Sequence, residues 1–371
     1  MVKKILIISR SFYPKNSPRS FRTTELAKEL AINGHEVSVL LPKDKHSDET
    51  EVFAKRYNII IKYYGVLTWP SFRYSKIFGD WTRKLGRLFF LLFQYPDIEV
   101  FFKIKRYLKN IENQYDLLIS IAAPHQNHWA VASIQSKYKI AKVWVADCGD
   151  PFMGNKLDTI RPPFYFNYLE NQFLSQADFV SVPTLGAVSA YKKKYHHKFK
   201  IIPQGFDFND INLGNWKPEN KTITFAYAGS ISQKGVRSPH NFINYLLNRD
   251  KEFKFYIFSS QTSILKNLAD KSGGRLILRD SINRNKLLQM LSKMDFLVNF
   301  DNGVRTASPS KLIDYTLTKR PILNINPFKP EENIIEEFLH KKFQHQFVVN
   351  DIQQYNIKNV AQSFLDCFYE K

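Results

Sequence analysis

The stretch from Asn299 to Ile325 constrains the fold most, because it joins a buried strand to a capped helix and then to a second strand. An apolar run at 296–298 predicts the first strand. A polar loop follows, and Ser308-Pro309 is typical of a helix start, with Ser as N-cap and Pro at the first helical position. We expect a helix over about 310–318 and a further strand at 322–325. Such a unit belongs in an open α/β sheet.

The start of this expected helix has the features of an anion site. The first N–H groups of a helix have no partner within it and attract phosphate. Asp314 lies about 6–9 Å further along, where its carboxylate can accept hydrogen bonds from ribose hydroxyls. An ordinary capped helix with a solvated Asp314 fits the same pattern, and the residues alone leave both interpretations open.

The sequence of residues 309–323, PSKLIDYTLTKRPIL, resembles the nucleotide-sugar segment of glycosyltransferase family 4, a large group of retaining enzymes with the GT-B fold. The resemblance implies that Ser308, Ser310 and Lys311 bind the donor. Asp314 falls where the family usually has the Glu that holds the nucleotide ribose. A second Glu of the family, near the donor sugar, is replaced here by Thr306.

Length and composition indicate a two-domain protein that resides in a reducing compartment. At 371 residues the chain is too long for one typical domain, and 44% hydrophobic residues are ample for buried cores. Its two cysteines, Cys148 and Cys367, have no metal-ligand spacing. Residues 2–8 predict a first strand rather than a signal peptide, and no apolar run is long enough for a membrane span. We therefore expect a cytoplasmic protein.

A net charge of +20 implies an anionic partner. Nucleic acid, phosphorylated small molecules and an acidic membrane surface all qualify.

The first domain begins with a βαβ unit. Residues 3–8 predict a buried parallel strand, 21–31 an amphipathic helix and 37–41 a second strand. The phrase LAKELAINGHEVSVLLP resembles the start of GT-B glycosyltransferases. In the loop before the helix, Asn16-Ser17-Pro18 replaces the glycines that the family usually has on its acceptor side.

Further strand-then-loop patterns continue through the chain. The expected strands end near 121, 146, 183 and 203 in the first domain, and a second set runs from 222–228 to 322–325. Together with the resemblance, they predict an α/β protein with two Rossmann-like doubly wound domains facing a central cleft. We place an acceptor domain at 1–208 and a donor domain at 209–351, with an interdomain linker at 209–221 and a C-terminal helix at 352–371 that packs back on the first domain.

Two histidines and two aspartates follow strand ends of the first domain. The resemblance implies that His125 meets the donor sugar, although His128 competes for this role and a lone His in such a loop is often only structural. The run DCGDPF resembles a family segment in which an Arg stands at the place of Gly149. Either Asp147 or Asp150 could orient an acceptor hydroxyl, and Asp150 could instead cap a helix. We predict His125 and Asp150 as catalytic residues.

In the second domain, the run GSISQKG resembles the loop whose Arg and Lys hold the pyrophosphate in the family. Gly229 and Ser230 open it, with Ser230 in place of the Arg. Lys234 is retained, and Arg237 lies close enough in sequence to substitute. We predict that all four contact the donor and that Lys234 is also catalytic, because fixed cations stabilise a leaving diphosphate. No Asp-x-Asp run indicates a metal-held nucleotide, so we expect neither a metal nor a cofactor beyond the nucleotide-sugar co-substrate.

Residues 62–110 are strongly basic and aromatic. They hold ten Lys and Arg against Asp80, Asp97 and Glu99. A helical wheel over 81–93 places Trp81, Leu85, Leu88, Phe89 and Leu92 within one arc and Arg83, Lys84 and Arg87 opposite. This pattern favours an interfacial helix on an anionic membrane, although a surface helix covering the core would show it too.

The sequence as a whole favours a metal-independent, retaining glycosyltransferase that moves a sugar from a nucleotide-sugar donor to a lipid-linked or cell-surface glycan acceptor, at the inner face of the cell membrane. The alternatives are a sugar-nucleotide epimerase of GT-B fold and, in a different class, a basic nucleic-acid-binding protein. Because no helix-turn-helix, RNP-type motif or zinc spacing is present, we expect no nucleic-acid partner.

Overall fold

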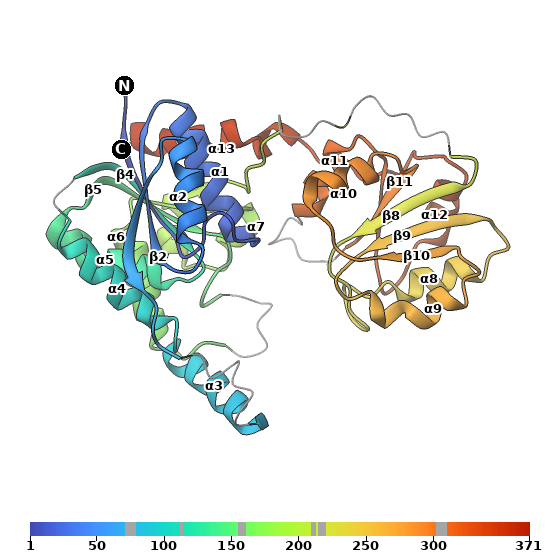
Figure 1. The fold of residues 1–371 in the computed structure, drawn as a ribbon, viewed down its shortest axis with the longest axis horizontal. Coiled ribbons are helices and arrows are strands. Elements are labelled where there is room, and N and C mark those ends of the chain that lie inside the picture. Colours follow the sequence, from blue (N-terminus) through green and yellow to red (C-terminus); the bar gives the residue numbers. More distant parts are fainter. Residues whose placement is uncertain (71–78, 112–113, 155–160, 209–212, 214–219, 302–309) are drawn as a thin grey trace. The chain divides into compact units, whose positions relative to one another are not determined.

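The computed structural model describes residues 1–70, 79–111, 114–154, 161–208, 213, 220–301 and 310–371. The chain divides into two compact units. Unit 1 comprises Met1–Phe206 with Gln354–Lys371, and unit 2 comprises Asp207–Gln353. Each unit holds one parallel sheet, of seven strands in unit 1 and five in unit 2 (Figure 1). The predicted α/β class with two doubly wound sheets is confirmed.

The sheet of unit 1 has the order β3-β2-β1-β4-β5-β6-β7, and every pair is parallel. Ile5 of β1 lies opposite Val37 on one side and Leu117 on the other. The strand order reverses between β1 and β4, and open sheets of this kind bind ligands at the carboxyl ends of the strands at such a point. The strands are β1 Lys4–Ile8, β2 Glu36–Lys43, β3 Ile60–Val66, β4 Tyr115–Ala122, β5 Ala141–Cys148, β6 Phe179–Val182 and β7 Phe199–Ile201.

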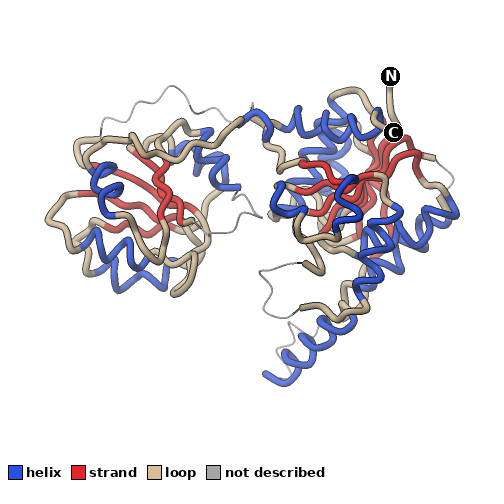
Figure 2. Tube along the Cα trace, turned by 180° about the vertical axis from the view of Figure 1, so that it is seen from behind, coloured by secondary structure: helices blue, strands red, loops and turns tan. Residues whose placement is uncertain are grey.

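Helices cover both faces of this sheet (Figure 2). Side chains alternate along a strand, so Ile5 and Ile7 enter one apolar cluster while Leu6 and Ile8 enter the other. The first cluster contains α1 and α13 residues, and the second contains α4, α5 and α6 residues. The helices are α1 Pro18–Ile32, α2 Ser47–Arg56, α3 Gly79–Phe93, α4 Ile98–Lys109, α5 Gln126–Tyr138, α6 Phe166–Gln176, α7 Leu185–Val188 and α13 Ile357–Tyr369.

The C-terminal helix α13 packs on unit 1. The Asn356 side chain caps its start by accepting a hydrogen bond from the N–H of Lys358. Val360 and Phe364 are fully buried in the α1 cluster, and Phe368 packs against it. An apolar stripe with a spacing of four residues therefore forms the face by which the last helix joins the first sheet.

Unit 2 is built around the order β10-β9-β8-β11-β12. Phe225 of β8 lies at its centre, with its ring stacked 4.5 Å from Phe296 and 4.8 Å from Phe255. The strands are β8 Ile223–Ala228, β9 Phe253–Phe258, β10 Leu276–Arg279, β11 Phe296–Phe300 and β12 Ile322–Ile325. The helices are α8 His240–Leu247, α9 Lys266–Asp270, α10 Arg284–Leu291, α11 Ser310–Leu317 and α12 Glu332–Leu339.

Sequence reasoning missed regular structure between residues 47 and 110. Helix α2, strand β3 and helix α4 continue the α/β pattern there. β3 is an edge strand, half-exposed over much of its length, so it lacks the continuous apolar run of a central strand. The expected linker at 209–221 lies largely outside the described residues. None of the described helices combines the length and the apolar character that crossing a membrane requires.

Candidate functional site

A pocket of about 300 Å³ opens at the carboxyl ends of β8, β9 and β10 in unit 2. This is the end of a doubly wound sheet at which ligands bind, close to the reversal of strand order between β8 and β11. Loop residues and side chains of α10 and α11 form its walls. The lining residues are Ala228, Gly229, Ser230, Phe258, Ser259, Ser260, Ser281, Ile282, Leu287, Leu291, Lys311, Asp314 and Tyr315.

Tyr315 fixes α11 against β8. Its hydroxyl accepts a hydrogen bond from the Ala228 N–H at 2.7 Å and donates to the Ala228 carbonyl, with 3.3 Å between the oxygens. The side chain is 1% exposed. Because Lys311 and Asp314 lie four and one residues before Tyr315 on the same helix, this anchor also sets where both side chains lie in the pocket.

Lys311 is the cation of the pocket. Its ammonium lies 4.4 Å from the centre of the Tyr227 ring and 3.4 Å from the Tyr227 hydroxyl. Burial, helped by the positive charge of Arg237, lowers the pKa of Lys311 to about 7. An anion in the pocket would reverse this effect, because it favours the charged ammonium.

Asp314 is paired with Arg284, the first residue of α10. The guanidinium donates to Oδ1 of Asp314 from Nη2 at 2.6 Å and from Nε at 3.0 Å. Burial raises the pKa of Asp314, and the charge and hydrogen bonds of Arg284 oppose that shift. The second carboxylate oxygen, Oδ2, carries no hydrogen bond from Arg284 in this arrangement.

The loop after β8 starts at a position that requires glycine. Gly229 has a φ of +144°, and its N–H donates to the Phe258 carbonyl at 3.0 Å. A side chain there would meet the Tyr227 hydroxyl at 3.3 Å. Lys234 and Arg237 lie further along this loop with exposed side chains, outside the set that lines the pocket. The effect of Arg237 on the pKa of Lys311 nevertheless indicates that its charge reaches the site.

Of the residues predicted to bind the donor, Gly229, Ser230, Lys311 and Asp314 meet in this pocket. The Ser230 carbonyl accepts a hydrogen bond from the Tyr227 hydroxyl at 2.7 Å. The predicted roles of Ser308, Thr306 and the Ser310 side chain fall outside the described part of the chain.

In unit 1, His125 lies just after β4, at the residue before α5. Its side chain is buried, and Nδ1 has no hydrogen-bond partner among the described residues. Burial and the neighbouring charge of Arg19 lower the pKa of His125 to about 4, so the imidazole is neutral at neutral pH. A neutral ring can donate a hydrogen bond from one nitrogen and accept one at the other.

His128, the competing residue, is committed to the protein core. It is 0% exposed, and its Nδ1 shares a hydrogen bond with the Ser120 hydroxyl at 2.7 Å. Its Nε2 lies 3.5 Å from the Cys148 sulfur. Both ring nitrogens of His128 therefore have protein partners, whereas Nδ1 of His125 has none among the described residues.

Arg19, at the start of α1, reaches across to Asp150. The Arg19 guanidinium donates to the Asp150 carboxylate at 2.8 Å, and the Asp150 side chain is 68% exposed. The guanidinium fills the space above Gly149, where an added Cβ would lie 1.7 Å from Arg19 Nη1. The missing side chain at 149 thus makes room for an arginine that comes from α1.

Asp147 is not available to orient an acceptor hydroxyl. Its carboxylate accepts hydrogen bonds from Arg22 at 2.8 and 3.0 Å and from the Ser181 hydroxyl at 2.7 Å. Both side chains of the Arg22–Asp147 pair are 4% exposed. Arg22 also donates to the carbonyls of Ile202 and Pro203, so the group ties α1, β5 and the chain after β7 together.

Several site residues were missed from sequence. Arg19 and Arg284 act on predicted residues but stand outside the motifs, and only their charge near a helix start could have drawn attention to them. The serines after β9 and the apolar residues around Ile282 lie on loops without a distinctive pattern.

Known structures share this architecture along the whole chain. The structure of Anabaena Alr3699/HepE, determined in complex with UDP and glucose, has 12% identity, a TM-score of 0.60 and coverage of 100% of both chains. The apo lipopolysaccharide outer core galactosyltransferase WaaB has 12% identity and a TM-score of 0.59, with 99% of each chain covered. The catalytic domain of starch synthase IV from Arabidopsis thaliana, bound to ADP and acarbose, has 12% identity and a TM-score of 0.59, with 100% of this chain and 99% of that chain covered. No curated protein sequence matches the chain.

The two parallel sheets and these neighbours define the GT-B class of glycosyltransferase folds. The model of Glycosyltransferase Family 4 matches residues 21–210, just over half of the chain. The chain belongs to glycosyltransferase family 4 and is a transferase of that fold.

Proposed function

We propose that this protein is a retaining glycosyltransferase that moves a sugar from a nucleotide-sugar donor to a lipid-linked or cell-surface glycan acceptor. The observation that carries the proposal is the pocket of unit 2, in which one helix supplies both Lys311 and Asp314. A cation and a carboxylate one turn apart suit the two polar parts of a nucleoside diphosphate, its diphosphate and its ribose.

The pocket divides naturally between these parts. Lys311, beside the Gly229 turn, takes the diphosphate, with Arg237 adding positive charge. Asp314 takes the ribose hydroxyls. The apolar wall formed by Ile282 and Leu287 accepts the face of the base.

Catalysis rests on the leaving diphosphate. Its negative charge grows as the bond to the sugar breaks, and cations already fixed in the protein stabilise that charge without reorganisation. Lys234 and Arg237, on an exposed loop beside the pocket, are the further cations that we assign to this task, without a metal ion. The leaving diphosphate also stabilises an oxocarbenium-like transition state, which provides a route to retention without a carboxylate nucleophile.

In unit 1, His125 and Asp150 serve the sugar chemistry. The neutral His125 ring, in the loop after β4, serves as a hydrogen-bond partner for a sugar hydroxyl. Asp150, exposed and held by Arg19, orients the acceptor hydroxyl. An ion pair of this kind fixes the direction of the carboxylate.

Helix α3 supports a membrane-borne acceptor. In Figure 1 it extends away from the sheet of unit 1. Leu85, Leu88 and Phe89 are 42%, 49% and 37% exposed, so the apolar arc over these residues is not covered by the core. Lys84 and Arg87 are exposed as well, whereas the side chains of Trp81 and Arg83 lie outside the described part. We propose that this helix lies on the inner face of an anionic cell membrane.

A thermal-shift panel of UDP-, GDP-, ADP- and TDP-sugars tests the proposed donor site, since a ligand that binds only the folded chain raises its melting temperature. We expect one nucleotide class to raise it in the wild type and not in Lys311→Met. A panel in which no nucleotide sugar changes the melting temperature would contradict the proposal. Lys266→Met, an exposed change on α9, is the matched control.

A further inference from the structure

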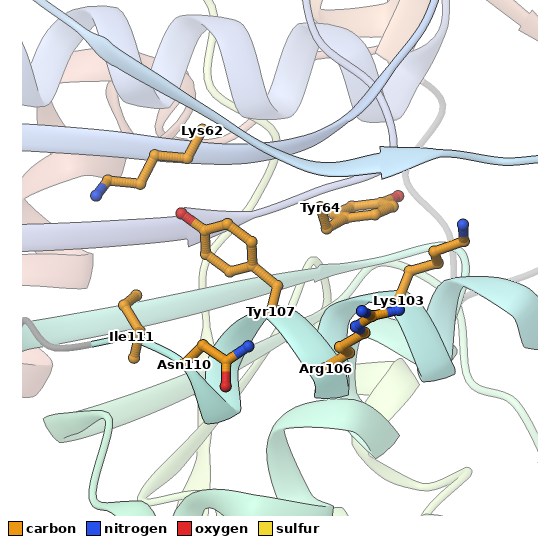
Figure 3. Close-up of a pocket in the computed structure, with 7 residues that line it drawn as sticks. All are labelled: Lys62, Tyr64, Lys103, Arg106, Tyr107, Asn110 and Ile111. Atoms are coloured by element: carbon orange, nitrogen blue, oxygen red, sulfur yellow. The ribbon is translucent and has the colours of Figure 1, made fainter.

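A second cavity, of about 410 Å³, lies in unit 1 between the edge strand β3 and helix α4. Figure 3 shows Lys62 and Tyr64 on the strand, across from side chains of the helix and the residues after it. The remaining lining residues are Lys103, Arg106, Tyr107, Asn110 and Ile111. The donor pocket is in unit 2, so this cavity is a separate site.

The cavity is positively charged. Three of its seven lining residues are cations, and none is acidic. Glu99 lies 3.8 Å from the ammonium of Lys103, but its carboxylate already accepts hydrogen bonds from the N–H groups of Thr68 and Trp69. Within the described part of the chain, no carboxylate forms an ion pair with Lys62 or Arg106. These two charges are available to an anion.

Tyr64 adds a hydrogen-bonding group. The residue is 6% exposed, and its hydroxyl is buried without a hydrogen-bond partner among the described residues. Native proteins rarely leave such a group unsatisfied, because its desolvation is not offset. Tyr107 and Asn110 bring two further polar side chains to the cavity wall. The set of donors and charges matches the oxygens of a phosphate group.

Exposed aromatic side chains lie on α4, on the chain after β3 and around the end of α3, and we call this group the aromatic rim. Phe102 precedes Lys103 on α4, is 53% exposed and lies 6.1 Å from Trp69, which is 40% exposed. Ring contacts continue from Trp69 through Tyr95 to Phe89 of α3 and on to Phe93. A soluble phosphate has no apolar part that could contact these rings. A lipid has one, because its phosphate and its apolar region meet at the membrane interface.

We propose that the β3–α4 cavity binds the phosphate of an anionic lipid head group while the aromatic rim enters the membrane interface. The site deepens the membrane contact put forward under Proposed function, since it gives α3 a specific lipid partner next to it. The cations that line the cavity hold the phosphate oxygens.

Vesicle co-sedimentation of the full chain tests this assignment with two variants of equal charge. Lys62→Ala/Arg106→Ala removes two cations from the cavity, and Lys105→Ala/Lys109→Ala removes two from α4 outside it. General attraction to an anionic surface is about equal for the two variants. We expect the cavity variant to bind vesicles of phosphatidylcholine with phosphatidylglycerol about tenfold more weakly than the α4 variant, because it also loses direct phosphate contacts.

Equal losses in the two variants would overturn the proposal, as would a wild type that stays unbound on anionic vesicles at low salt. Saturable binding of soluble sn-glycerol 3-phosphate, as tight as binding to vesicles, would also overturn it by assigning the cavity to a free phosphate ester. UDP binding by both variants, measured without lipid, separates this question from the donor site, because failure of the lipid site leaves that binding unchanged. Melting temperatures confirm that both variants are folded.

Discussion

Asp314, which lines the pocket of unit 2, forms an ion pair at 2.6 Å with Arg284, although thirty residues separate them in the sequence. The guanidinium holds one carboxylate oxygen of Asp314, and its charge opposes the burial that raises the pKa of this acid. We propose that Oδ2, which accepts no hydrogen bond from Arg284, binds the ribose, so that the ion pair orients Asp314 before the nucleotide binds.

Asp314→Ala should weaken nucleotide binding by roughly 1–3 kcal/mol, the range for hydrogen bonds to a charged group. Calorimetric titration with the nucleotide that stabilises the wild type measures the change. Asp270→Ala, on α9 and exposed, removes the same charge away from the pocket and should have no effect. Unchanged affinity in Asp314→Ala would remove this residue from the site.

Nucleotide binding should take up a proton at Lys311. Burial holds the pKa of the free ammonium at about 7, far below its ordinary value, so part of the protein carries a neutral Lys311 at pH 8. A diphosphate favours the charged form and raises the pKa, so binding consumes protons and weakens as the pH rises above 7. Titrations at pH 8 in HEPES and in Tris report the number of protons from the difference in heat.

In Lys311→Met this proton uptake should disappear along with most of the affinity. If the wild type binds nucleotide with identical heats in both buffers, Lys311 does not meet the diphosphate.

The two loop cations make separable predictions. Lys234→Ala should lower turnover more than it lowers stability, because the side chain is exposed and its partner is the leaving group. Arg237→Ala should also shift the pKa of Lys311 upward, since its charge contributes to the depression. Steady-state release of nucleoside diphosphate measures the turnover of both variants. A silent Lys234→Ala beside a damaging Arg237→Ala would assign the catalytic role to Arg237 alone.

The Arg22–Asp147 pair should matter for stability. Arg22→Met leaves a buried carboxylate without its partner, a change that costs about 3–5 kcal/mol. Arg22→Met/Asp147→Asn should recover part of the loss. Urea denaturation, followed through the transition in which unit 1 unfolds, measures the free energy of unfolding of both variants. Glu36→Ala, which breaks an exposed pair with Lys4, should change the free energy of unfolding by at most about 1 kcal/mol. A similarly small effect for Arg22→Met would show that the buried pair is dispensable.

Sequence reasoning brought residues of the unit 2 pocket together where one short stretch carries the information. Lys311 and Asp314 share a helix with a recognisable start, so their spacing alone places them together. The contacts of Arg19 and Arg284 could not be predicted from local spacing in this way. Arg19 reaches Asp150 across 131 residues, and only the fold brings them together.

The structure also explains why β3 was missed. An edge strand needs no continuous apolar run, and Lys62 and Gly65 interrupt the pattern that marks a central strand. The same irregularity places Lys62 on the wall of the second cavity. His125 was predicted by its place after a strand, but its neutrality depends on burial that no local pattern reveals.

A crystal structure of the chain with the nucleotide sugar that stabilises it best is the most direct test of the central claim. The account predicts the diphosphate beside Lys311 and the Gly229 turn, with ribose hydroxyls within hydrogen-bond distance of Asp314. A nucleotide bound elsewhere, with Asp314 paired only to Arg284, would contradict it.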